Sequence, residues 1–188
     1  MEAAALASVV IAGASLAGST IEKISNAINT ERNVTIHITN FCKDYNLTNP
    51  RVFTSSGYSH DPPQPTIKTQ TMEACSFTKN PNKQWGCVGV LTYDVCKIEK
   101  GKADCCLAIM FSVPYDYDKY ENWFAVGIFD SDRSCDESLF NLMYYESGSF
   151  SRDNSSGNEI KQVWNAIEIK GTMSPRAKSI MKVEVWDY

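Results

Sequence analysis

One stretch carries most of the information in this chain: Phe111-Ser112-Val113-Pro114-Tyr115-Asp116-Tyr117-Asp118-Lys119-Tyr120-Glu121-Asn122-Trp123-Phe124. It places four tyrosine or tryptophan rings close to a proline, between two segments of strand-like composition. Rings with polar edges suit the boundary between water and lipid, and their faces attract quaternary ammonium groups. Aromatic residues are also frequent in ordinary strands. The stretch therefore predicts two strands joined by an aromatic connection, whose role depends on the rest of the chain.

Strand patterns extend from this stretch in both directions. Val34, Ile36 and Ile38 alternate with polar residues, which predicts a half-buried strand. Seven more segments have strand composition: residues 51–55, 66–71, 85–96, 104–112, 122–129, 163–170 and 179–186. Residues 55–65 and 147–157 are rich in turn formers and are expected to be loops. Many short strands separated by turns predict a mainly β fold, an antiparallel sandwich or barrel.

One helix is predicted within the strand series. The run Ser134-Cys135-Asp136-Glu137 has the pattern of a capping box, with Ser134 as the N-cap and Glu137 three residues later. Apolar residues at helical spacing follow this run, and the predicted helix ends near Tyr144 and Tyr145.

The N-terminus is almost free of charge, since residues 3–21 contain no charged side chain. Apolar and small residues recur there at steps of three and four, the spacing of one helical face: Leu6, Val10, Gly13, Ala17, Ile21, Ile24 and Ile28. A helix over residues 6–28 would be about 34 Å long at roughly 1.5 Å per residue. The hydrocarbon core of a bilayer is about 30 Å thick. The pattern predicts an amphipathic helix of membrane-spanning length.

Several interpretations of this helix remain open. A signal peptide needs a basic first region, and only Glu2 is charged before Glu22. A permanent anchor needs more apolar area than alanine, glycine and serine supply. A helix that is stored on a soluble body and inserted later fits the small residues, which pack both on protein and between helices in lipid. The remaining interpretation is a docked surface helix without a membrane role.

Length and charge limit the classes of function. The 188 residues are expected to form one domain, with an arm at residues 1–29 and a body at residues 30–188. The net charge of −4 and the pI near 5.2 argue against a nucleic-acid partner and against attraction to strongly anionic membranes. Zwitterionic lipid headgroups remain the compatible membrane surface.

The reactive side chains form no catalytic or metal-binding pattern. The two histidines, His37 and His60, accompany no nucleophile motif, and no Gly-rich phosphate loop occurs. The seven cysteines have no C-x-x-C spacing, so we expect no metal site and no cofactor. Cys96 and Cys105 flank a short connection and are placed to face each other across a hairpin; the alternative is that all seven are reduced, buried thiols. We do not expect an enzyme.

Several segments together resemble a known family. Residues 111–117 and 122–124 are similar to the signature of the actinoporins, the pore-forming cytolysins of sea anemones. Residues 13–16, 89–93 and 143–145 resemble the family's N-terminal helix, a central strand and the end of its second helix. The cysteines and the acidic charge are most similar to the actinoporin-like proteins of fishes and other non-anemone animals. The resemblance implies a compact β-sandwich flanked by two α-helices, one of them the N-terminal amphipathic helix.

The resemblance also implies a site for a phosphocholine headgroup. The family's headgroup residues correspond to seven positions of this chain: Ser56, Val88, Ser112, Pro114, Tyr120, Tyr144 and Tyr145. Tyrosine faces would hold the choline, and hydroxyl groups would donate to the phosphate. The residues expected to contact the membrane are Tyr115, Tyr117, Trp123 and Phe124.

Several positions depart from the anemone pattern. Lys119 replaces an aromatic residue, Phe140 replaces a tyrosine, and the chain reads Ser151-Arg152-Asp153 where the anemone proteins have Arg-Gly-Asp. Asp118 and Glu121 add negative charge beside the rings, which weakens docking on anionic surfaces. These changes predict membrane binding that is weaker than that of the anemone toxins or tuned to another lipid.

The sequence thus predicts a pore-forming protein that binds sphingomyelin or phosphatidylcholine. We expect a monomer in solution and a homo-oligomer in the membrane, where the N-terminal helix inserts to form a cation-permeable pore. The alternatives are a glycan-binding lectin of similar fold and a lipid-headgroup sensor that does not lyse membranes. Secretion followed by action on a target cell membrane is expected, with storage in the cytosol as the alternative because no signal peptide is recognised.

Overall fold

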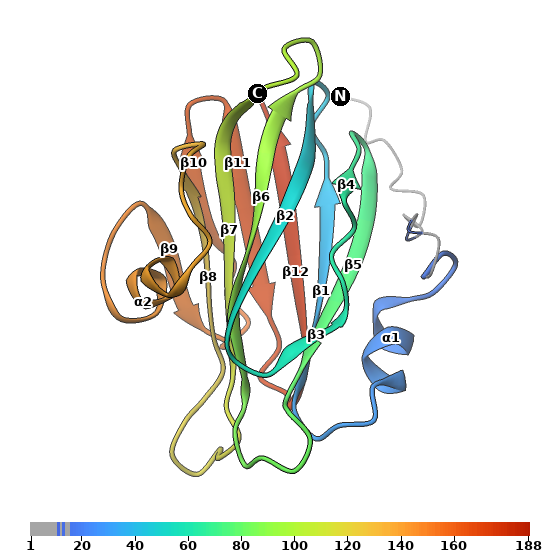
Figure 1. The fold of residues 1–188 in the computed structure, drawn as a ribbon, viewed down its shortest axis with the longest axis vertical. Helices are drawn as coiled ribbons and strands as arrows, with labels where there is room; N and C mark the ends of the chain where they lie inside the picture. The colour runs from blue at the N-terminus through green and yellow to red at the C-terminus, as the bar shows by residue number, and fades with distance from the viewer. Residues whose placement is uncertain (1–10, 12, 14–15) are drawn as a thin grey trace.

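The computed structural model describes residues 11, 13 and 16–188 (Figure 1). These residues form two sheets and two helices. The first sheet, sheet A, runs in the order β10 (Ile160–Trp164), β11 (Ile167–Met173), β12 (Lys178–Asp187), β1 (Asn33–Asn40), β5 (Thr71–Thr78) and β3 (Tyr58–Asp61). Sheet B runs in the order β4 (Thr66–Ile67), β2 (Tyr45–Ser56), β6 (Cys87–Lys97), β7 (Ala103–Val113), β8 (Trp123–Phe129) and β9 (Phe150–Asn154). The prediction of a mainly β sandwich is confirmed.

The two sheets pack face to face around one large core. In β1 the inward residues are Val34, Ile36 and Ile38, so the strand predicted from their alternation is confirmed. Phe111 of β7 stacks on Phe77 of β5, with ring centroids 4.5 Å apart, and this pair joins the two sheets. Burial of such rings supplies most of the attraction between two sheets that share no hydrogen-bonded ladder.

One strand pairing differs from the antiparallel prediction. β1 and β12 run parallel, from Asn33 beside Lys178 to Asn40 beside Val185. The first and last strands of the chain are thus neighbours in sheet A (Figure 1). The other strand pairs of the described chain are antiparallel. A sequence pattern cannot reveal this pairing, because it joins segments from opposite ends of the chain.

Three strands were missed by the sequence pattern. β3 and β9 lie inside the predicted loops, and both are edge strands with no fully buried residue. The strand predicted at residues 66–71 covers β4 and reaches only the first residue of β5. β5 was missed because it is buried on both faces and therefore shows no alternation of apolar and polar residues. Its Phe77 faces the core, and its Met72 and Ala74 face the N-terminal arm.

The first helix is much shorter than predicted. α1 spans Ile21–Ala27, and its N-cap Thr20 accepts a hydrogen bond from the backbone N–H of Lys23 at 3.3 Å. Gly18 precedes it with a φ of 77°, a left-handed conformation that a continuous helix cannot contain. Ile11 forms an isolated bridge with β5 instead of a helical turn. The prediction of one helix over residues 6–28 is therefore wrong over the described positions from 11 to 20.

The predicted apolar stripe is preserved only in part. Ile21, Ile24 and Ile28 are buried, while Ala17 is exposed. Leu6 and Val10 lie outside the described residues. Of the two helices that the structure describes, neither is both long enough and apolar enough to cross a bilayer.

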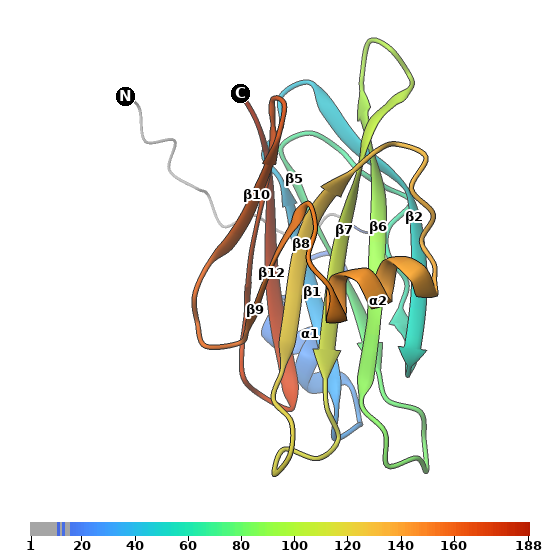
Figure 2. The same cartoon turned by 90° about the vertical axis from the view of Figure 1, so that its left-hand side faces the viewer.

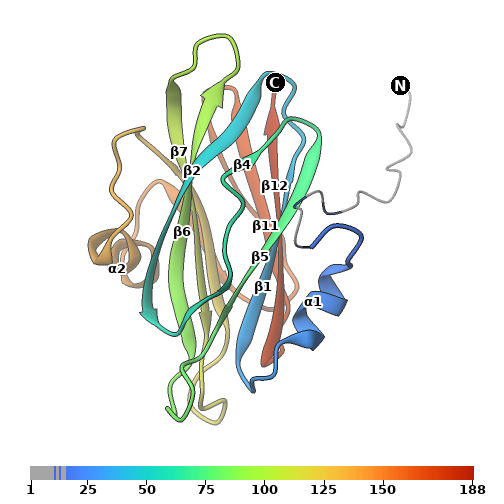
Figure 3. The ribbon, with the colours of Figure 1, turned by 45° about the vertical axis from the view of Figure 1, so that its right-hand side comes forward.

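α1 and α2 (Glu137–Tyr145) lie on opposite sides of the sandwich (Figure 3). α1 lies on the outer face of sheet A, against β1 and β12. Ile24 packs there with Ile11 and Ala74 in a small apolar cluster. Gly13 adds a polar contact, since its backbone N–H donates to the Glu73 carboxylate at 2.6 Å. Burial raises the pKa of Glu73.

All seven cysteines lie in the described part of the chain and are free thiols. Cys96 and Cys105 do not face each other across the hairpin, because a bulge places Cys96 beside Ala103 and Cys105 beside Val95. Burial raises the pKa of the Cys105 thiol to about 12 and that of Cys106 to about 11. Thiols of such high pKa carry little thiolate near neutral pH and react slowly.

His37 makes the stability of this fold sensitive to acid. Its ring lies on the outer face of β1, and burial together with the nearby Lys182 lowers its pKa from 6.5 to about 4, against the opposing charge of Glu22. Between pH 6.5 and about 4 the unfolded chain binds the proton and the folded chain does not, so acid favours unfolding. We expect a loss of about 1–3 kcal/mol over this window from His37 alone.

Urea unfolding at pH 7 and pH 4.5 would measure this effect, with His37→Gln as the comparison. Glu73, whose pKa is raised, acts in the opposite direction in both proteins. The parent is expected to lose more stability on acidification than the variant. Equal losses of stability in the two proteins would show that His37 does not cause the sensitivity to acid.

Candidate functional site

One row of side chains crosses the end of sheet B on its outer face. The register places Ser56 beside Val88, Val88 beside Ser112, and Ser112 beside Trp123. Each belongs to a different strand, from β2 to β8, and alternation along β7 turns Ser112 away from the core that holds Phe111. The resemblance predicts Ser56, Val88 and Ser112 as headgroup residues and Trp123 as a membrane-contact residue, and the sheet brings these four together.

α2 lies across the same outer face (Figure 2). Its N-cap is Asp136, whose carboxylate accepts from the backbone N–H of Leu139 at 3.0 Å. The predicted capping box is therefore wrong by two residues, because the Asp136 carboxylate binds the free N–H groups in place of Ser134. Leu139 and Met143 pack on Val90 of β6, which fixes the helix on the sheet.

The last turn of α2 carries an aromatic series toward the surface. Phe140 stacks on Tyr144 with centroids 5.4 Å apart, and Tyr145 meets Tyr144 edge-on at 4.7 Å. Phe140 also contacts Phe53 of β2 at 6.1 Å. Tyr144 packs against the cluster that includes Val88, whereas Tyr145 is 70% exposed. The predicted pair of tyrosines thus presents one anchored ring and one open ring beside the row.

The two predicted serines differ in what they can donate. Ser56 donates its hydroxyl hydrogen to the Gly86 carbonyl at 2.7 Å, so it has an acceptor rather than a donor to offer. Ser112, which is 3% exposed, makes no side-chain hydrogen bond within the described chain. Gly86 is required for this arrangement, since a Cβ there would overlap the Val113 carbonyl. Of the two serines, Ser112 is therefore the buried one whose hydroxyl hydrogen has no acceptor within the described chain.

The β7–β8 connection forms a second side of this surface. The Asp116 carboxylate accepts from the backbone N–H of Asp118 at 3.0 Å and pairs with the Lys119 ammonium at 3.2 Å. The hydrogen bond from Lys119 lowers the pKa of Asp116. The backbone N–H of Tyr120 donates to the Asp116 carbonyl at 3.1 Å. This turn presents Tyr120, predicted as a headgroup residue, at 63% exposure.

Two of the predicted membrane-contact tyrosines face a cation of the protein itself. The guanidinium carbon of Arg32 lies 5.1 Å from the ring centre of Tyr115 and 5.0 Å from that of Tyr117. Tyr117 also donates its hydroxyl to Asn122 at 2.7 Å. One face of each ring is therefore occupied in this form of the protein.

The adjacent residues Phe124 and Trp123 lie on opposite faces of β8. Phe124 is 0% exposed and belongs to the core between the sheets, so it does not contact a membrane in this structure. The reason is strand alternation, which turns Phe124 inward and the adjacent Trp123 outward. Trp123 is half-buried in the row described above.

Sequence analysis missed Trp85, which lies in the β5–β6 connection. It was assigned to the beginning of a strand, but β6 begins at Cys87 and Trp85 is 63% exposed. The Lys83 ammonium lies 5.9 Å from its ring centre. The β5–β6 and β7–β8 connections project from the same end of the sandwich (Figure 1). The run Asn80-Pro81-Asn82, which precedes Trp85, is the signal in the sequence that indicates a loop there.

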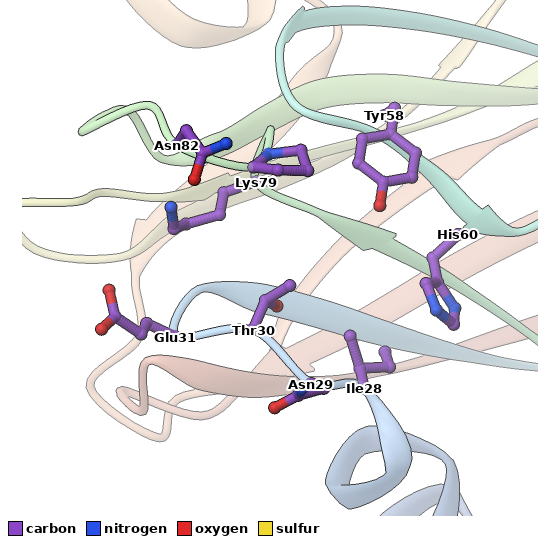
Figure 4. Close-up of a pocket in the computed structure, with 9 residues that line it drawn as sticks. Ile28, Asn29, Thr30, Glu31, Tyr58, His60, Lys79 and Asn82 are labelled. Atoms are coloured by element: carbon purple, nitrogen blue, oxygen red, sulfur yellow. The ribbon is translucent and has the colours of Figure 1, made fainter.

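A cavity of about 490 Å³ lies at the base of the N-terminal arm (Figure 4). One wall is the α1–β1 connection, and the other comes from β3 and the β5–β6 connection. The lining residues are Ile28, Asn29, Thr30, Glu31, Tyr58, His60, Lys79, Pro81 and Asn82. The cavity therefore lies between the segment that follows α1 and the edge of sheet A.

The profile of the sea anemone cytotoxic proteins matches residues 5–187 of this chain. The chain belongs to this family, the actinoporins. DELTA-stichotoxin-Hcr4a of Radianthus crispa is 29% identical over 183 residues, which are 96% of this chain and 99% of the toxin. Bryoporin of Physcomitrium patens, a non-anemone member, is 26% identical over 181 residues, which are 96% of this chain and 98% of bryoporin. The predicted resemblance to actinoporins is confirmed.

Another relative has a higher sequence identity to this chain, but over a shorter alignment. DELTA-thalatoxin-Avl1b of Actineria villosa is 35% identical over 147 residues, which are 76% of this chain and only 61% of the toxin. Among solved structures, the lipid binding protein Nakanori aligns with a TM-score of 0.67 at 10% identity, over 88% of this chain and 75% of Nakanori. That structural match shows the shared fold.

The N-cap of α2 provides a test of how this surface is held. Asp136→Ala removes the hydrogen bond to Leu139 and is expected to lower the free energy of unfolding by about 0.5–2 kcal/mol. Ser134→Ala, at the N-cap position first predicted, is the matched control and should change it by less than about 0.5 kcal/mol. Urea unfolding of both variants measures the difference. A larger effect at Ser134 than at Asp136 would contradict the observed cap.

Proposed function

We propose that this protein binds phosphocholine headgroups of sphingomyelin or phosphatidylcholine, oligomerises on the membrane and forms a cation-permeable pore. The observation that carries the proposal is the convergence, on one face of sheet B, of the row from Ser56 to Trp123 with the tyrosines at the end of α2. Family membership supports the proposal, because DELTA-stichotoxin-Hcr4a and bryoporin each align with 96% of this chain.

The chemistry of this face suits a zwitterionic headgroup. Exposed rings such as Tyr120 and Tyr145 attract a quaternary ammonium group through their faces. The Ser112 hydroxyl is free to donate to a phosphate oxygen, and Val88 provides an apolar contact for the choline methyl groups. A chain of net charge −4 gains nothing from anionic lipid, so a zwitterionic surface is the compatible target.

The N-terminal arm, residues 1–29, is the proposed membrane-inserting part, and residues 30–188 are the headgroup-binding body. α1 has only seven residues and buries Ile21, Ile24 and Ser25 against sheet A, while Gly13, before the helix, binds the Glu73 carboxylate. We propose that the arm leaves sheet A on the membrane and extends its helix from α1 toward Leu6. Lipid supplies no competing hydrogen bonds, so a helix satisfies the arm's backbone there.

The proposed partners are lipids and other copies of this chain. The protein is monomeric in solution and assembles after docking, which concentrates it on the surface. Secretion followed by action on a target cell membrane accords with the family's toxins. No catalytic step belongs to this function.

Tyrosine variants test the headgroup site. Tyr145→Ala should weaken binding to sphingomyelin vesicles by the loss of about 0.5–2 kcal/mol of cation–π attraction. Tyr145→Phe should cost less, because the ring face remains. Tyr188→Ala removes another exposed tyrosine, at the C-terminus and outside the proposed site, and should have no effect. Vesicle sedimentation measures all three.

Soluble competitors sharpen the same experiment. Free phosphocholine should displace the protein from vesicles, and phosphoethanolamine, which lacks the quaternary nitrogen, should do so poorly. If Tyr145→Ala binds as tightly as the parent while a sugar displaces both, the face is a lectin site and the phosphocholine proposal fails.

A charge in the arm tests insertion. Val10→Asp should abolish dye release from sphingomyelin vesicles, because a charge at the centre of a membrane helix costs about 2.5–3.5 kcal/mol. Binding to the vesicles should persist, since the headgroup site lies on sheet B. Val10→Ala is the control and should retain release. Full release by Val10→Asp would exclude insertion of the arm in the proposed register.

A further inference from the structure

We infer that two arginines, Arg32 and Arg152, are positioning residues that hold the two sides of the headgroup site in place. This inference rests on the proposed function. One side of the site is the β7–β8 connection, which begins with Pro114 and presents Tyr120. The other side is the last turn of α2, which presents Tyr144 and Tyr145. Each side is bound at its backbone carbonyls by one guanidinium group, that of Arg32 just before β1 or that of Arg152 in β9.

Arg32 holds the β7–β8 connection. It stands immediately before β1, in sheet A, and reaches across to the connection that follows β7 in sheet B. Its Nε donates to the Pro114 carbonyl at 3.0 Å and to the Tyr115 carbonyl at 3.1 Å, and its Nη2 donates to the Tyr115 carbonyl at 2.6 Å. The rings of Tyr115 and Tyr117 lie against the same guanidinium. One cation thus fixes both the backbone and the rings.

The backbone of Arg32 is itself fixed to β5. Its carbonyl accepts from the backbone N–H of Lys79 at 3.0 Å and from the Thr78 hydroxyl at 3.3 Å. Thr30, two residues earlier, meets Thr78 hydroxyl to hydroxyl at 2.6 Å. Arg32 therefore belongs to the body, directly beyond the cavity between the segment that follows α1 and the edge of sheet A, and it can hold the connection while the arm moves.

Arg152 holds the end of α2. Its Nη1 donates to the Met143 carbonyl at 2.8 Å and to the Glu146 carbonyl at 2.8 Å. The carbonyls of a helix's last turn lack partners within the helix and carry partial negative charge. α2 has no basic residue in its own last turn, so Arg152 of β9 supplies the missing cation. The two bonded carbonyls bracket Tyr144 and Tyr145 in the chain.

Neither arginine is part of an ion pair in the described chain, whose ion pairs involve other residues. Both side chains are half-buried, and both bind carbonyls on segments that lack regular structure or are ending it. Bonds from a charged donor are stronger than neutral ones, and the planar guanidinium fixes direction as well as distance. Holding the rings before the lipid arrives reduces the entropy that binding must remove.

The test compares Arg32→Gln and Arg152→Gln with Arg176→Gln. Arg176 is exposed and its side chain makes no hydrogen bond in the described chain, so this control has the same change in charge. Each of the first two variants should weaken binding to sphingomyelin vesicles roughly tenfold, from the loss of one set of charged hydrogen bonds. The double variant should weaken it roughly a hundredfold, because the two sides are independent. The control should stay within about twofold of the parent.

Lysine variants separate positioning from attraction of the phosphate. Arg32→Lys and Arg152→Lys keep the positive charge but lose the planar fork. Positioning predicts that binding stays weakened. Full recovery by lysine would overturn the inference, since charge alone would then suffice.

Hydrogen exchange without lipid keeps the inference separate from the proposed function. Arg32→Gln should speed exchange at the amides of Lys119 and Tyr120, and Arg152→Gln at Glu146, with the amides of β1 unchanged. If the parent fails to bind phosphocholine vesicles, the proposed function falls, while faster local exchange would still support the two holding contacts. Exchange that is unchanged, or that rises equally throughout the sandwich, would overturn the inference.

Discussion

The proposed site depends on one constraint, which is that sheet B is apolar on both faces while only one face is fully covered. The inner face packs on sheet A. On the outer face Val90, Met110 and Ala125 are buried beneath α2. The helix has nine residues, whereas β6 and β7 each have eleven and cross beneath it. The helix packs over Val90 and Met110, and the row from Ser56 to Trp123 lies two residues further along these strands, where Ser112 is buried and the other three residues are half-buried. The rings of Tyr144 and Tyr145, at the end of α2, lie beside this row.

The outer face of sheet A, on the opposite side of the sandwich, is more polar than that of sheet B. The outward residues of β1 are Thr35, His37 and Thr39, so sheet A offers the arm little apolar surface. Helix α1 compensates with Ile21, Ile24 and Ile28, and small residues precede it. Both helices have an N-cap and buried apolar residues, and a basic side chain binds the carbonyls at the end of each, Lys178 for α1 and Arg152 for α2.

Much of the fold was accessible from the sequence, and the failures have physical causes. The alternation in β1 and the composition of β6, β7 and β8 predicted these strands, because the residue types along a strand reflect what each of its two faces contacts. β5 was missed since the arm covers its outer face, and the parallel pairing of β1 with β12 was missed because it joins opposite chain ends. The headgroup residues came from resemblance rather than from periodicity, and the sheet register then placed Ser56, Val88, Ser112 and Trp123 side by side. No local pattern could reveal that Arg32 reaches Tyr115.

The free thiols have a consequence for how the sandwich is held closed. With no disulfide across the sheets, side-chain packing and a few hydrogen bonds, such as those of Arg32 and Asn122, oppose their separation. Cys75 and Cys87 come from different sheets and both belong to the shared core, where burial raises the pKa of each thiol. A reagent in solution can reach them only when the sheets part. Four cysteines, Cys42, Cys75, Cys87 and Cys105, are buried in this shared core, so the rate at which a thiol reagent modifies them measures how often the sandwich opens.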